Sequence, residues 1–236
     1  RIPTKHILQV TGVSRLIAKI EAVGDGSTRF PLAQHVMAAG HEVSVWNRTA
    51  ATADTWAQTY NGQAAPSIET AVDGADYVMM CVGNDDDVFA VAKPALAAMK
   101  AHRKQGGVLI DHTTASAKCA RTVHAWAQAA GVGFVDAPIS GGSVKASHGN
   151  LSIMASGTPK AFEAAKPVLD ATSETVFELG DSAGAGSAMK AVNQLLAGVH
   201  IATMAEALTF GMTQWTTNIL VHTLNIMKEY GGMAIT

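Results

Sequence analysis

The stretch "DYVMMCVGNDDDVFAVAKPALAAMKAHRKQGGVLIDHT", residues 76–113, contains two apolar runs with a helix-like segment between them. The runs 76–82 and 107–113 have continuously apolar centres, at 77–82 and 108–110, as expected of strands buried on both faces. Residues 86–100 have the spacing of a helix that tolerates Pro94. A helix between two such strands is typical of a parallel βαβ unit. This stretch predicts an α/β fold.

The same alternation of strands and helices continues on both sides of this stretch. We predict further strands at 18–23, 41–46, 133–139, 151–157 and 175–180, and further helices at 31–40, 49–60, 116–130 and 159–171. The pattern predicts a doubly wound, Rossmann-type parallel sheet covered on both faces. From about residue 183 the period changes, and residues 183–212 can form one apolar helix about 45 Å long. We therefore expect a dinucleotide-binding domain over 1–180 and the start of an all-helical domain over 181–236.

Composition and charge exclude several classes of protein. Of the 236 residues, 15% are charged and 48% apolar, which is typical of a compact globular chain. A net charge of -2 and the lack of a Lys/Arg cluster argue against nucleic acid as a partner. No uninterrupted apolar stretch is long enough to cross a membrane. The two cysteines are far apart in the sequence, which favours a reducing, cytoplasmic compartment. The scattered histidines argue against a metal site.

A glycine-rich turn follows the first predicted strand in "VGDGSTRFPLAQ". Gly24 and Gly26 fill the first two positions of the pattern G-x-G-x-x-G, whereas Arg29 occupies the third. Such a turn can bind a pyrophosphate on the backbone N–H groups at a helix N-terminus. The pattern therefore predicts a dinucleotide site, with an ordinary strand-to-helix turn as the alternative.

The segment "WNRT" follows the second predicted strand, where an NAD-specific site normally has Asp or Glu. Arg48 can stack on adenine or pair with a 2′-phosphate, and Asn47 and Thr49 can donate to the same group. These residues favour NADP over NAD, although NAD remains possible. Alternatively, Asn47 and Thr49 cap the next helix.

A single lysine interrupts the apolar helix in "GAGSAMKAVNQLLAG", residues 184–198. Lys190 has Asn193 one turn further on the same face. A partly desolvated lysine has a lowered pKa, which suits general acid/base chemistry. The small residues Gly184, Gly186 and Ser187 would let another molecule approach the start of the helix. Alternatively, Lys190 extends its ammonium into water.

Five segments in order, "HEVSVWNRT", "DHTTAS", "FVDAPISGG", "HGNLSIMASG" and "GAGSAMKAVNQLLAG", resemble the β-hydroxyacid dehydrogenases. This is the group of 3-hydroxyisobutyrate dehydrogenase, tartronate semialdehyde reductase and, more distantly, 6-phosphogluconate dehydrogenase. The resemblance covers roughly residues 30 to 212.

The resemblance implies a role for each matching residue. Lys190 matches the catalytic lysine and Asn193 its substrate-orienting partner. The matching substrate-binding residues are Ser140, Gly141 and Gly142, and Thr114 matches the position beside the nicotinamide and the substrate. Val82 and Gly83 would line the cofactor cleft together with Gly24, Gly26, Asn47, Arg48, Thr49 and Thr114.

The implied function is that of an NADP-dependent oxidoreductase of the 3-hydroxyacid dehydrogenase type. It would transfer a hydride between the nicotinamide and a small β-hydroxyacid or semialdehyde. Lys190 would donate a proton to the carbonyl oxygen during reduction and accept one during oxidation. The expected partner is a small carboxylate substrate, and no metal is required.

Several positions depart from the family pattern. Arg29 replaces the third glycine, and Lys145 stands where glycine is usual after "SGG". After Met212 the chain does not follow the family, and we expect most of the helical domain to be missing. An exposed apolar helix would then pair with a second copy, as a homodimer or tetramer. Alternatives are a non-catalytic dinucleotide-binding or dimerisation protein and, less favoured because of Lys190 with Asn193, an imine reductase.

Overall fold

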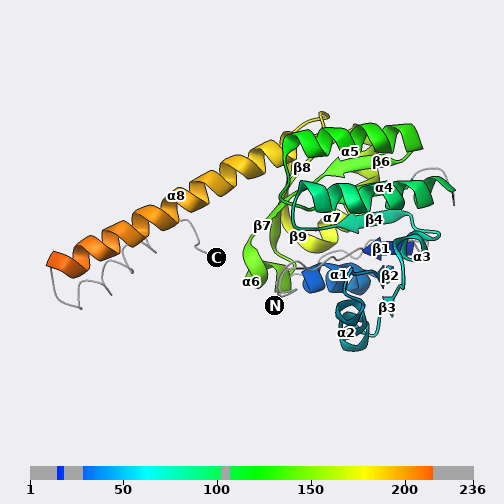
Figure 1. The fold of residues 1–236 in the computed structure, drawn as a ribbon, viewed down its shortest axis with the longest axis horizontal. Helices are drawn as coiled ribbons and strands as arrows, with labels where there is room; N and C mark the ends of the chain where they lie inside the picture. The colour runs from blue at the N-terminus through cyan, green and yellow to red at the C-terminus, as the bar shows by residue number, and fades with distance from the viewer. Residues whose placement is uncertain (1–14, 19–28, 102–106, 215–236) are drawn as a thin grey trace, which may run out of the picture.

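The structure, a computed structural model, describes residues 15–18, 29–101 and 107–214, and the sheet forms its centre (Figure 1). Six parallel strands lie in the order β3-β2-β1-β4-β5-β6, which confirms the Rossmann-type expectation. They are β1 (Arg15–Ala18), β2 (Glu42–Val45), β3 (Gln63–Ala64), β4 (Tyr77–Met80), β5 (Val108–Asp111) and β6 (Gly133–Asp136).

The sheet is not parallel throughout, contrary to the prediction. Three further strands, β7 (Ile139–Ser140), β8 (Leu151–Gly157) and β9 (Ser173–Glu178), extend it beyond β6. β8 is antiparallel to both β6 and β7, and β9 is parallel to β8. A parallel neighbour needs a crossover of a dozen or more residues, usually a long helix. The connection from β6 to β8 contains only β7 and the short helix α6 (Gly142–Ser147), whereas α7 (Pro159–Thr172) provides the crossover from β8 to β9.

Helices cover both faces of the sheet, as predicted. One face carries α1 (Arg29–Ala38), α2 (Ala50–Tyr60) and α7, whose buried residues form one core cluster around Trp56 and Val135. The other face carries α3 (Ile68–Val72), α4 (Asp85–Ala101) and α5 (Ala117–Ala130), packed around Leu109 and Phe134. α4 continues through Pro94, and Ser116 caps α5 by accepting a hydrogen bond from the N–H of Cys119.

The first strand lies earlier in the chain than predicted. β1 occupies Arg15–Ala18 and pairs with β2 and β4, whereas the predicted strand was 18–23. Residues 19–23 lie outside the described residues. The apolar pair Leu16 and Ile17 therefore belongs to the sheet.

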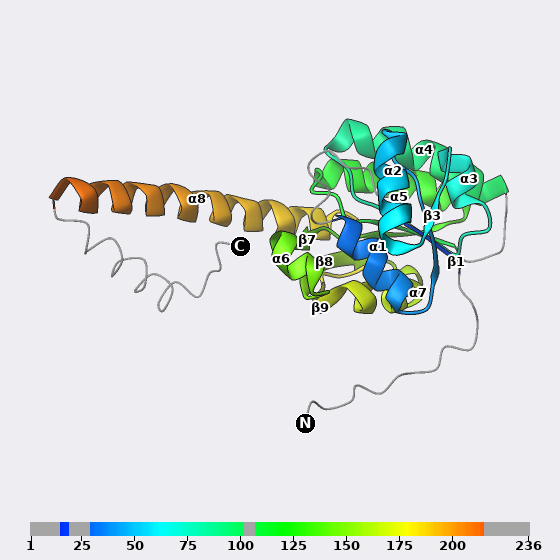
Figure 2. The ribbon, with the colours of Figure 1, turned by 90° about the horizontal axis from the view of Figure 1, so that it is seen from below.

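A single helix, α8 (Ala185–Gln214), leaves the sheet and projects far beyond it (Figure 2). Its first turns pack against β6, β8 and α5. Large apolar side chains are exposed along α8 from its second turn onward: Met189, Val192, Leu195, Leu196, Val199, Ile201 and Phe210. Within the described part of the chain, no helix combines the length and hydropathy needed to cross a membrane. The expected domain boundary at residue 180 stays a prediction.

Candidate active site

Three side chains predicted to act together meet where α8 passes β7. Lys190 is 6% exposed, and its Nζ donates a hydrogen bond to Oδ1 of Asn193 at 3.3 Å. Ser140 on β7 donates from Oγ to the same oxygen, also at 3.3 Å. Because one carboxamide oxygen accepts both bonds, the Nδ2 group of Asn193 is the part that can donate to a ligand.

Burial lowers the pKa of the Lys190 ammonium, because leaving water disfavours the charged form. The alternative in which this lysine extends into water is therefore wrong for this structure. A lysine with a lowered pKa exchanges protons more readily near neutral pH than an exposed one.

The turn after Ser140 has a conformation that glycine adopts readily. Gly141 has φ +133° and Gly142 has φ +64°, both in the region that side chains disfavour. A Cβ at Gly141 would lie 2.8 Å from Cβ of Lys145. Lys145, the departure from the family pattern, therefore packs its stem against this glycine, and α6 begins directly after it.

The carboxyl ends of β4 and β5 are joined by hydrogen bonds. The N–H of Val82 donates to Oγ1 of Thr113 at 3.0 Å, and the N–H of Thr113 donates to Oδ1 of Asp111 at 2.9 Å. Gly83 and Thr114, the next residues along each strand end, are exposed. The structure thus places the predicted cofactor-lining residues at adjacent strand ends.

The end of β2 holds the predicted nucleotide-selecting residues. Asn47 is buried and accepts a hydrogen bond at Oδ1 from the N–H of Thr49 at 2.8 Å. Thr49 is the N-cap residue of α2, but its side chain makes no capping hydrogen bond. The Arg48 guanidinium is 61% exposed and pairs with Asp87 at the start of α4, with 3.3 Å between Nη1 and Oδ1. The capping alternative thus holds for the position of Thr49 but not for its hydroxyl.

The two glycines of the predicted phosphate-binding turn, Gly24 and Gly26, lie outside the described residues. Their proposed role therefore stays a prediction. The helix that should follow the turn is present as α1.

The small residues at the start of α8 serve a different purpose from the one predicted. A Cβ at Gly186 would lie 2.4 Å from the carbonyl oxygen of Met154, and one at Gly184 would lie 2.8 Å from that of Ala117. These glycines therefore allow close contact between α8 and two elements of the same chain, β8 and α5. The prediction that these residues admit another molecule is wrong, because β8 and α5 already occupy that space.

Sequence reasoning did not identify the buried polar residues at the ends of β5 and β6. Asp136, 1% exposed, binds the start of α8, and His112 donates from Nδ1 to the carbonyl oxygen of Ala137 at 2.7 Å. Burial raises the pKa of Asp111 to about 7 and lowers that of His112 to about 4. Polar residues directly after apolar strands, as in "LIDHT" and "FVDAP", were the available signal.

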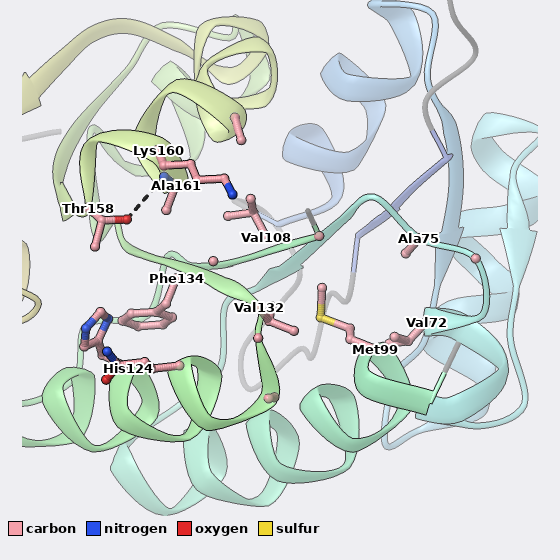
Figure 3. A pocket seen from close by; sticks show the side chains of 17 residues that line it. Val72, Ala75, Met99, Val108, His124, Val132, Phe134, Thr158, Lys160 and Ala161 are labelled. Atoms are coloured by element: carbon pink, nitrogen blue, oxygen red, sulfur yellow. Dashed lines mark hydrogen bonds between the residues drawn. The ribbon is translucent and has the colours of Figure 1, made fainter. Parts of the chain in front are cut away.

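A separate cavity of about 630 Å³ lies at the opposite end of the strands from Lys190, at the amino ends of β5 and β6. Its lining includes Val108 and Gly133, the first residues of β5 and β6, with Lys160 and His124 at its sides (Figure 3). Doubly wound sheets bind ligands beyond the carboxyl ends of their strands. The candidate active site is therefore the cluster around Lys190 and not this cavity. Among the residues described, no group of three or more His, Cys, Asp or Glu side chains could hold a metal ion.

The strand order and the strand-end residues define a Rossmann-type dinucleotide-binding domain, followed by a helix that carries a buried lysine. Residues 19–180 match the family model of the NAD binding domain of 6-phosphogluconate dehydrogenase. The chain belongs to this family.

Two curated relatives agree with this membership. The chain is 40% identical to an uncharacterized oxidoreductase of Shewanella frigidimarina over 82% of this chain and 66% of that protein. It is 39% identical to L-threonate dehydrogenase of Pectobacterium atrosepticum over 62% of this chain and 48% of that protein. The chain thus spans about two thirds or less of the length of these curated relatives.

The fold also resembles a solved structure. The crystal structure of 3-hydroxyisobutyrate dehydrogenase from Salmonella typhimurium has a TM-score of 0.79 and 29% identity, with 93% of this chain and 75% of that chain covered.

Proposed function

We propose that this protein is an NADP-dependent oxidoreductase that interconverts a small β-hydroxyacid and the corresponding semialdehyde or oxo acid. The observation that carries the proposal is the cluster of Lys190, Asn193 and Ser140. This cluster lies on the side of the sheet where the strands have their carboxyl ends and where the dinucleotide fold binds its ligand. The names of the dehydrogenases that it resembles support the same class of reaction.

Lys190 is the proposed general acid and base. The bound nicotinamide would supply or accept the hydride, which is chemistry that the protein does not provide itself. During reduction, Nζ of Lys190 donates a proton to the carbonyl oxygen as negative charge develops there. During oxidation, the neutral amine accepts the hydroxyl proton. Burial lowers the pKa of Lys190, so the neutral form is accessible at lower pH than for an exposed lysine.

The substrate carboxylate would bind at the turn that follows β7. The hydroxyl of Ser140 would turn from Oδ1 of Asn193 to the ligand, and Gly141 and Gly142 offer backbone N–H groups without side chains in the way. Asn193 would orient the reacting oxygen through Nδ2, because its Oδ1 already accepts from Lys190. These groups suit a short molecule with a carboxylate close to a hydroxyl or carbonyl group.

The residues at the end of β2 support NADP as the cofactor. In this position the chain has Asn47, Arg48 and Thr49 in place of the carboxylate that would bind the ribose hydroxyls of NAD. A 2′-phosphate would compete with Asp87 for the guanidinium of Arg48. NADP binding therefore requires Arg48 to leave or share that ion pair.

We further propose that two copies associate through α8, as a homodimer or within a tetramer. Leu195 and Phe210 are 67% and 68% exposed on a helix whose apolar residues lie on several sides. Such a helix is normally buried against other protein. Both cysteines are free thiols, which supports a reducing, cytoplasmic location.

The proposal is tested by following the oxidation of NADPH, and separately of NADH, with succinic, methylmalonate and tartronate semialdehydes and glyoxylate. We expect turnover with a preference for NADPH. Binding of NADPH without turnover of any of these compounds would instead favour a non-catalytic dinucleotide-binding protein.

A further inference from the structure

Asp136 is the last residue of β6, and its carboxylate is almost completely buried. It accepts three hydrogen bonds from the start of α8: from the N–H of Gly184 at 3.0 Å, from the N–H of Ser187 at 2.9 Å and from Oγ of Ser187 at 2.6 Å. Oγ of Ser156 donates a fourth bond at 3.3 Å. A carboxylate that accepts the unpaired N–H groups of a helix start caps that helix, and the helix dipole favours its charge.

The first turn of α8 has no room to move toward the sheet. The N–H of Gly186 donates to Oγ of Ser156 at 3.1 Å. A Cβ at Gly186 would lie 2.4 Å from the carbonyl oxygen of Met154 and 2.8 Å from that of Asp136. The helix start is therefore held by its hydrogen bonds to Asp136 and Ser156 and by close contact with the carbonyl oxygens of Met154 and Asp136.

The same face of α8 carries the proposed acid/base group. Ser187, Lys190 and Asn193 follow one another at intervals of three residues, so their side chains lie along one side of the helix. Ser187 and Lys190 are buried and Asn193 is half-buried, whereas most residues further along α8 are exposed. The Asp136 contacts thus lie one helical turn before the lysine.

We propose that Asp136 is a positioning residue for Lys190: by capping α8 on the end of β6, it fixes the amine, together with Asn193, beside Ser140. This inference rests on the proposed oxidoreductase function for its catalytic consequence. Its structural consequence, the burial of Lys190, can be measured without any substrate.

Two substitutions of Asp136 separate capping from charge. Asp136→Ala removes all four acceptor bonds. Asp136→Asn keeps an oxygen for the N–H groups of Gly184 and Ser187, and its amide can donate to Oγ of Ser187. We expect the Ala variant to lower kcat by about 10- to 100-fold with a much smaller change in KM, since displacements near 1 Å cost that much in rate. The Asn variant should retain most of the wild-type kcat.

The second readout is the rate at which trace acetic anhydride acetylates Lys190, measured against pH by mass spectrometry of the peptide that contains it. The midpoint of this profile is the pH at which the rate is half of its maximum. Burial holds the pKa of Lys190 below its ordinary value, so a helix start that moves away from the sheet should raise this midpoint. Only desolvation lowers this pKa, and Asp111, which faces Asp136 from β5, retains its place in each variant. The midpoint should rise in Asp136→Ala and stay near wild type in Asp136→Asn.

A purely structural effect is excluded by a control in the same domain. Thr172→Val removes the hydrogen bonds of a fully buried hydroxyl at the end of α7 and should leave the Lys190 midpoint unchanged. If Asp136→Ala does not fold, Ser187→Ala, which removes the 2.6 Å bond alone, should raise the midpoint to a smaller extent.

An unchanged midpoint in the variant that loses the Asp136 contacts overturns the inference, whatever happens to kcat. A raised midpoint with an unchanged kcat overturns its catalytic part. If the wild-type protein reduces none of the substrates, the proposed function fails, and the labelling midpoint still decides whether Asp136 positions Lys190.

Discussion

Replacing Gly186 by Ala should destabilise the protein, although alanine is normally the better residue in a helix. The added Cβ would lie 2.4 Å from the carbonyl oxygen of Met154, whereas real Cβ contacts are essentially never shorter than 3.0 Å. The start of α8 and β8 must therefore separate by about 0.6 Å, the difference between these distances. Overpacking of this kind costs about 1–3 kcal/mol, and alanine returns about 1 kcal/mol of helix propensity.

The same helix provides a matched control at Gly198. No atom lies within 4 Å of a Cβ built there, so Gly198→Ala should gain about 0.5–1 kcal/mol from helix propensity alone. Gly186→Ala should lose up to about 2 kcal/mol, the balance of an overpacking cost of about 1–3 kcal/mol and a propensity gain of about 1 kcal/mol.

Urea denaturation followed by circular dichroism measures the free energy of unfolding of both variants. Two protein concentrations separate any contribution from association through α8. The reasoning is refuted if Gly186→Ala is as stable as Gly198→Ala, because α8 would then not be in backbone contact with the sheet.

Three further predictions concern the cofactor, pH and assembly. Asp87→Asn should lower KM for NADPH about 3- to 10-fold and leave KM for NADH unchanged, because the carboxylate that pairs with Arg48 repels a 2′-phosphate; equal changes for both cofactors would contradict the NADP assignment. Burial raises the pKa of Asp111 from 3.8 to about 7, so the folded protein holds this proton more tightly than the unfolded chain does. The contribution of this group to the free energy of unfolding is therefore complete below pH 4 and is lost as the pH rises to 7. Asp111→Asn, which keeps an oxygen for the N–H of Thr113, should therefore gain unfolding free energy relative to wild type between pH 4 and 7 in urea titrations; a constant difference would show that this carboxyl is not buried. Leu195→Lys should convert a dimer into monomers in sedimentation equilibrium, and an unchanged mass would place the interface elsewhere than on this part of α8.

Much of the fold follows from local patterns in the sequence. The apolar runs at β4 and β5 and the helix period of α4 were sufficient to predict their order and their burial on both faces. β8 was predicted with its observed bounds and β9 within two residues, whereas β7 was predicted as part of the strand that begins at residue 133. The direction of these strands depends on the length of the connection and on pairing between distant residues. The two-residue strand β3 and the five-residue helix α3 are too short to produce a period.

The candidate site was predictable where a residue's own chemistry is exceptional for its surroundings. Lys190 in an apolar helix and the glycines after Ser140 are such residues, and the structure brings Ser140, Lys190 and Asn193 together. The signal for Asp136, a polar residue directly after an apolar strand, is weaker, because a carboxylate at a strand end is also common on surfaces. Its importance depends on three bonds to residues 184 and 187, which only the fold brings near.

The most direct test of the proposed function is the rate of NADPH oxidation by Lys190→Met, with NADPH binding measured in parallel by fluorescence. Lys160→Met is the matched control, because this lysine is exposed beside the cavity at the amino ends of β5 and β6, far from Lys190 in the fold. Loss of the proton donor should lower kcat by about 100-fold or more without changing the affinity for NADPH, and the control should retain the wild-type rate. A Lys190→Met protein that reduces semialdehydes at the rate of the control would show that the buried lysine does not carry the proton.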